Sequence, residues 1–132
     1  MNWFIGSHHV REEGDVLAVT FRGEFSLQEM KQFITALERV IESHGRYGGL
    51  FDMQRLDTIS PEARRFAGKW PRHGACYGNA CFGAGVTART LAALILRAVK
   101  LFSGRTSPIS FFKTEQDARA WLAVQRERVG KP

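Results

Sequence analysis

The sequence predicts an α/β domain with a mixed, mostly parallel five-stranded sheet and four helices, in the order β-β-α-β-α-β-α-β-α. Three observations lead to this fold class. Short apolar runs alternate with segments of helical period, capping residues mark helix starts, and the 132-residue chain holds no internal repeat or linker. Strands that alternate with helices form βαβ units, so we expect a single domain over residues 1–132.

The first elements are expected to be a hairpin followed by a long helix. Residues 3–10 are rich in aromatic and β-branched side chains, Gly14 lies in a turn, and residues 15–22 alternate in strand fashion. Ser26 and Glu29 then form a capping box. Apolar residues recur at threes and fours up to His44, and Gly45 ends this helix.

The middle of the chain reads as a strand over 47–53, a polar loop and a second helix. Ser60 and Pro61 are typical of a helix start, and Pro71 stops the helix. Phe66, Ala67 and Trp70 are expected to form its buried side. A small-residue strand over 75–84, a helix over 86–102, a short strand over 108–112 and a final helix capped by Thr114 complete the order.

The bulk composition is that of a soluble globular protein, with 44% hydrophobic and 24% charged residues. No apolar run approaches the ~20 residues of a membrane span, and no signal peptide is apparent. The spacing of Cys76 and Cys81 on one strand disfavours a disulfide between them. Reduced thiols point to a cytoplasmic protein.

Charge is unevenly distributed along the chain. Residues 1–62 hold ten acids and six Lys or Arg, whereas residues 63–114 hold nine Lys or Arg and no acid. Surfaces usually mix the two signs. A long stretch without acids therefore predicts a cationic surface patch, carried by the second and third helices.

Two segments resemble a known family once these elements are in place. The segments LFDMQRLDTISPEARRF and FFKTEQDARAWL, together with the element order, are similar to the STAS domains, the SpoIIAA-like (anti-sigma-factor-antagonist) family, over nearly the whole chain. The resemblance implies a SpoIIAA-like sandwich, no catalytic machinery and no cofactor. It also implies that a protein partner binds through the loop before the second helix.

The resemblance also locates a departure from the signalling members, which carry a phosphorylated serine at the start of that helix. Asp52 matches their first aspartate, Ser60 stands where the second aspartate would be, and Pro61 stands on the phosphorylated serine. Proline has no hydroxyl, so the usual serine phospho-switch is not expected. Thr58 and Ser60 are the nearby hydroxyls.

Catalytic and metal sites are not indicated by the sequence. Asp52 and Asp57 are read as a strand-end cap and a turn residue and not as an acid–base pair. The four histidines match no common zinc spacing, and the chain has no nucleophile elbow or P-loop. The glycine-rich run over 78–85 is read as close packing in a strand, with phosphate binding as the alternative.

We therefore expect a non-enzymatic regulatory module that binds an acidic protein partner. The expected partner-binding residues are Asp52, Met53, Asp57, Thr58, Ser60, Arg64, Arg65, Arg89, Leu96 and Arg97. The alternative is a carrier of a lipophilic ligand, a lipid for example, held in a pocket walled by the helix over 86–102. Nucleic acid is disfavoured because stacking aromatics are missing beside the arginines. A second apolar row on the helix over 86–102 also allows a homodimer.

Overall fold

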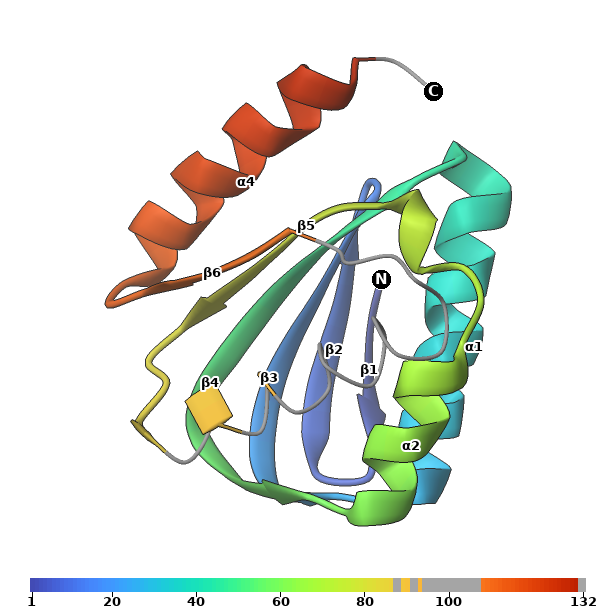
Figure 1. Ribbon diagram of the computed structural model, residues 1–132, viewed down its shortest axis with the longest axis vertical. Helices are drawn as coiled ribbons and strands as arrows, with labels where there is room; N and C mark the ends of the chain where they lie inside the picture. Colours follow the sequence, from blue (N-terminus) through green and yellow to red (C-terminus); the bar gives the residue numbers. More distant parts are fainter. Residues whose placement is uncertain (87–88, 91–92, 94–107, 131–132) are drawn as a thin grey trace.

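The structure is a computed structural model that describes residues 1–86, 89–90, 93 and 108–130. One twisted sheet runs through the molecule in the order β1-β2-β3-β4-β5-β6 (Figure 1). Its strands are β1 (Asn2–Ile5), β2 (His8–Glu13), β3 (Val16–Phe25), β4 (Tyr47–Ile59), β5 (Cys76–Phe82) and β6 (Ile109–Phe112). The first three strands pair antiparallel and the remaining pairs are parallel, so the expected mixed, mostly parallel sheet is confirmed.

The described residues form six strands and not the expected five. The segment expected to be one strand over 3–10 is a hairpin, in which Trp3 pairs with Val10. Gly6 makes the turn with a φ of 59°, a conformation that favours glycine. A Cβ on Gly6 would also collide with the carboxylate of Glu29. The sequence analysis missed this turn because residues 3–10 are rich in aromatic and β-branched side chains, and such a pattern does not show where one strand ends and the next begins.

Three α-helices lie in the described part of the chain: α1 (Leu27–His44), α2 (Pro61–Lys69) and α4 (Glu115–Val129). Their expected caps are present. The Ser26 hydroxyl accepts from the Glu29 amide at 3.2 Å while the Glu29 carboxylate accepts from the Ser26 amide at 2.8 Å. The Thr114 hydroxyl likewise accepts from the Asp117 amide at 3.2 Å. The fourth expected helix, over 86–102, falls largely outside the described residues.

The helices cover opposite faces of the sheet. Helices α1 and α2 stand side by side on one face, whereas α4 lies on the other (Figure 1). The larger core lies under α1 and α2 and contains Leu17, Val19, Phe25 and Val40, all 2% exposed or less. Under α4 a smaller core contains Leu50, Ala80 and Leu122.

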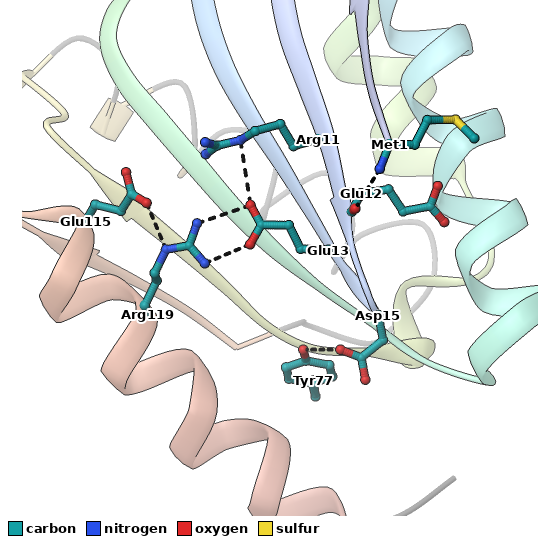
Figure 2. Close-up of polar contacts among 8 residues, drawn as sticks. All are labelled: Met1, Arg11, Glu12, Glu13, Asp15, Tyr77, Glu115 and Arg119. Atoms are coloured by element: carbon teal, nitrogen blue, oxygen red, sulfur yellow. Dashed lines mark hydrogen bonds and ion pairs between the residues drawn. The ribbon is translucent and has the colours of Figure 1, made fainter.

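Ion pairs fasten α4 to the β2–β3 hairpin. Arg119 on α4 reaches Glu13 through both terminal nitrogens, at 2.8 and 3.2 Å, and donates to Glu115 at 2.8 Å (Figure 2). In the turn of the same hairpin, the Asp15 carboxylate accepts hydrogen bonds from the Tyr77 hydroxyl at 2.8 Å and from the Arg46 and Arg126 guanidinium groups at 3.0 Å each. These contacts join residues from opposite ends of the chain.

Candidate partner-binding site

The segment that the sequence analysis treated as a polar loop is the second half of a strand. β4 continues through Ile59, although β5 accompanies it only as far as Asp52, which pairs with Phe82. At that point the Asp52 carboxylate accepts from the Gln54 amide at 3.1 Å, so it caps the end of the β4–β5 pairing. Asp52 therefore marks the end of the β4–β5 pairing but not the end of β4, and Asp57 is an exposed strand residue and not the expected turn residue.

Two irregularities in the pairing of β4 with β3 shape this segment. The register shifts between Thr20 and Arg22 and again between Gly23 and Glu24, and each shift places an extra residue on β4. Bulges are rare between parallel strands and often re-aim side chains beside functional sites. Here the two bulges leave the side chains of residues 54–55 and 57–58 outside the core, whereas those of Met53, Leu56 and Ile59 are buried in it.

Helix α2 begins where β4 ends. The Ser60 amide donates to the Phe25 carbonyl at 3.0 Å, which ties the start of α2 to the end of β3. The Ser60 hydroxyl accepts from the Ala63 amide at 3.1 Å, and Pro61 follows at the first helical position. Ser60 therefore holds the helix start, as the sequence predicts.

Helix α2 carries two arginines that have no paired acid within the described residues. Arg65 is exposed and Arg64 is half-buried, and neither has an ion pair there. Arg55, on the bulged part of β4, is exposed and likewise lacks an ion pair in that part of the chain. We call Asp52, Arg55, Asp57, Thr58, Arg64 and Arg65 the β4–α2 surface. The sequence analysis missed Arg55 because the bulge that exposes it depends on β3.

Not every expected site residue lies on this surface. Met53 is 7% exposed and lines a cavity. The Arg89 guanidinium lies over the ring of Phe111 on β6, 5.2 Å from its centroid. Leu96 and Arg97 lie outside the described residues. The expectation that the second and third helices form one cationic surface patch therefore stays a prediction.

An apolar cavity of about 130 Å³ lies between the sheet and the helices α1 and α2. Phe21, Phe33, Phe51, Met53 and Trp70 are among its lining residues. Asn79 and His73 supply polar atoms to the wall, and the His73 ring is within 2.7 Å of the Ala67 carbonyl. Burial lowers the pKa of His73, which favours the neutral ring at pH 7. The cavity can therefore accept an apolar group.

The described residues offer little reactive chemistry. Burial raises the pKa of Cys81 to about 12, which keeps this thiol protonated and poorly nucleophilic. Burial and the hydrogen bond to Asp15 raise the pKa of Tyr77. No three metal-ligating side chains of the described residues converge, and no helix among those residues is long and apolar enough to cross a membrane.

Several solved structures are similar to this chain, and two of them are described here. One is an uncharacterised protein of the DUF3478 family with a SpoIIAA-like fold from Shewanella loihica PV-4, at 22% identity and a TM-score of 0.57 over 88% of this chain and 92% of that chain. The other is the anti-sigma factor antagonist SpoIIAA in its unphosphorylated form, at 13% identity and a TM-score of 0.51 over 89% and 98% of the two chains. A search of curated proteins finds no match.

The sequence itself matches the SpoIIAA-like family model over residues 16–123. This range runs from the first residue of β3 into α4 and includes β4, α2 and the β4–α2 surface. The solved structures support the fold independently, since both cover most of the chain. The chain belongs to the SpoIIAA-like family.

Proposed function

We propose that this protein is a non-enzymatic regulatory module that binds an acidic protein partner through the β4–α2 surface. The observation that carries the proposal is the lack of ion pairs, among the described residues, at Arg55 on the bulged part of β4 and at Arg64 and Arg65 on α2. One solved structure with the same fold is an anti-sigma factor antagonist, which is consistent with a protein-binding role.

The arrangement suits electrostatic recognition. Helices α1 and α2 both begin at the same edge of the sheet, because each follows the carboxyl end of a parallel strand. Helix N-termini carry partial positive charge, which adds to that of the arginines. Such a surface would accelerate association with an acidic partner and would lose this advantage as salt increases. Asp52 and Asp57 would contribute specificity at its margin.

Affinity capture from native cell extract tests the proposal. The double variant Arg64→Glu with Arg65→Glu should lose the captured partner at low salt. A matched control, Lys113→Glu with Arg128→Glu, changes the net charge equally at exposed positions of the β6–α4 region and should retain it. If both double variants capture the same protein as the unmodified chain does, the β4–α2 surface is not the binding site.

The apolar cavity favours a second candidate, a carrier of a lipophilic ligand. A cavity near 150 Å³ lined by aliphatic and aromatic side chains is large enough to hold benzene, and the cavity found here is of similar size, at about 130 Å³. Native mass spectrometry of the purified protein should then show a bound apolar mass. Ala67→Leu, which adds bulk to the cavity wall, should remove it. A ligand-free spectrum for the unmodified protein would count against the carrier role.

The expected cytoplasmic location and the homodimer stay predictions. Size-exclusion chromatography with light scattering measures the oligomeric state directly. The sequence argument against nucleic acid assumed that Phe66 is buried, but its side chain, next to Arg65, is 37% exposed. A steep salt dependence of binding to an oligonucleotide would be the signature of nucleic-acid binding.

A further inference from the structure

Strand β1 forms an open edge of the sheet (Figure 1). The Glu12 amide donates to the Met1 carbonyl at 2.9 Å, so these two residues form a hydrogen-bonded pair of the antiparallel ladder. Hydrogen-bonded and non-hydrogen-bonded pairs alternate along such a ladder. Trp3 therefore bonds to β2, whereas the N–H and C=O groups of Asn2 and Phe4 point away from it. These outward groups have no hydrogen-bond partner among the described residues.

This edge lacks the charges, prolines and bulges that usually keep an edge strand from pairing with another molecule. The sequence of β1 is NWFI, and its pairing with β2 shows no register shift. By contrast, β6 at the other edge is flanked by Pro108 and Lys113. Apolar surface also gathers at β1, since Phe4 is 66% exposed and Met1 is 79% exposed. The edge thus offers free backbone groups beside exposed apolar side chains.

We propose that β1 pairs antiparallel with β1 of a second copy of this chain and forms a symmetric dimer with one continuous sheet. With Asn2 opposite Phe4 of the second copy, every outward N–H and C=O group of both residues is used, because each such pair exchanges two hydrogen bonds. A two-fold axis then passes between the two Trp3 residues. The pairing of identical edges closes after two copies.

The side chains of β1 also suit a second copy. The Arg39 guanidinium of α1 lies over the Trp3 ring, 5.5 Å from its centroid, so Trp3 faces the α1 side of the sheet. Phe4 lies on the opposite side, with its ring centroid 5.1 Å from that of His9. In the proposed register the two Trp3 side chains are directly opposite each other, and the two Phe4 side chains are diagonal neighbours within reach of each other. Aromatic side chains therefore meet on both faces, and β1 brings no charge that would repel its own copy.

The small size of the edge limits the strength of the dimer. A strand of four residues with two aromatic side chains buries less surface than the ~1,200 Å² at the lower end of stable interfaces. We expect a dissociation constant of about 10 µM. This dimer uses neither the β4–α2 surface nor the helix over 86–102 on which the homodimer expected from the sequence depends.

Sedimentation velocity over a protein concentration range of about 1–500 µM tests the proposal. Phe4→Pro removes an outward N–H that the single chain does not use, and it should stay monomeric throughout. Phe4→Ala keeps this N–H but loses the ring, so the dissociation constant should rise about tenfold. The matched control is Val124→Ala on α4, where Val124 is 48% exposed, and it should dimerise as the unmodified chain does.

Cross-linking tests the register independently, including the case in which Phe4→Pro does not fold. Directly opposite residues of a non-hydrogen-bonded pair have Cα atoms ~4.5 Å apart, a distance that permits a disulfide. Trp3→Cys should therefore give a disulfide-linked dimer under mild oxidation, whereas Val124→Cys should not; Cys76 and Cys81 are buried. A protein that is monomeric at every concentration overturns the proposal. A dimer that Phe4→Pro leaves intact, or one that Trp3→Cys does not cross-link, also overturns it.

Discussion

Replacing Asp15 by asparagine should destabilise the whole fold because this carboxylate joins three distant segments. Asp15 is 6% exposed and accepts hydrogen bonds from Tyr77, Arg46 and Arg126, at 2.8, 3.0 and 3.0 Å. Tyr77 lies on β5, Arg46 precedes β4 and Arg126 is on α4. Asparagine has nearly the same shape but lacks the charge and one acceptor oxygen, so the change tests electrostatics and not packing.

The size of the effect follows from the burial of each donor. The Arg126 side chain is 53% exposed and can turn to water, whereas that of Arg46 is 11% exposed and would keep its contacts with the Gly130 carbonyl and the Tyr77 ring. Tyr77 is 3% exposed and would lose a charged acceptor. Hydrogen bonds to charged groups are each worth about 1.5–3 kcal/mol. We expect a loss of about 3 kcal/mol in the free energy of unfolding and a fall in Tm of about 10 °C.

The effect should depend on pH in a defined direction. Burial opposes ionisation of Asp15, but the hydrogen bonds from Tyr77, Arg126 and Arg46 outweigh it and hold its pKa below the ordinary 3.8. A carboxyl whose pKa is depressed on folding contributes stability above its unfolded pKa and loses it as the pH falls through its folded pKa. The difference between the unmodified protein and Asp15→Asn should therefore be full at pH 7 and shrink below about pH 4.

Urea unfolding followed by circular dichroism at several pH values measures this difference. Asp57→Asn is the control, since Asp57 is exposed and makes no ion pair within the described residues, and it should shift stability by less than about 0.5 kcal/mol. A loss for Asp15→Asn no larger than that of the control would refute the role of this carboxylate. A loss that stayed constant down to pH 2 would refute its charge as the cause.

Three further changes should have distinct effects. Ser60→Ala removes the cap of α2 and should cost about 1 kcal/mol in urea unfolding, whereas Ser60→Asp should be nearly neutral, because aspartate also caps helices. Gly48→Ala should cost about 2 kcal/mol because its Cβ would lie 2.5 Å from the Tyr77 ring, and Gly85→Ala, with open space, is its control in thermal unfolding. Arg119→Gln should cost at most about 1 kcal/mol, a loss that 1 M salt should erase, since its ion pairs are solvent-exposed.

Local signals in the sequence were enough to predict most of the elements. The capping box at Ser26 and Glu29 and the Ser60-Pro61 pair placed the starts of α1 and α2 correctly, because a cap is a contact within one turn. The family resemblance, which rested on the segment around Asp52 and on the closing strand and helix, was confirmed by the family match. The bulged extension of β4 carried no such signal, since its register is set by β3.

The sequence by itself determined the order of the described strands and helices from β3 onward, their caps and the acid-free stretch that carries Arg64 and Arg65, because each depends on neighbours a few residues away. Only the tertiary structure decided the exposure of Phe66, the apolar cavity and the three donors on Asp15. Those features depend on residues brought together from distant parts of the chain, such as Asp15 and Arg126, which are 111 positions apart. Local periodicity holds no information on such contacts, because they form only when the helices pack on the completed sheet.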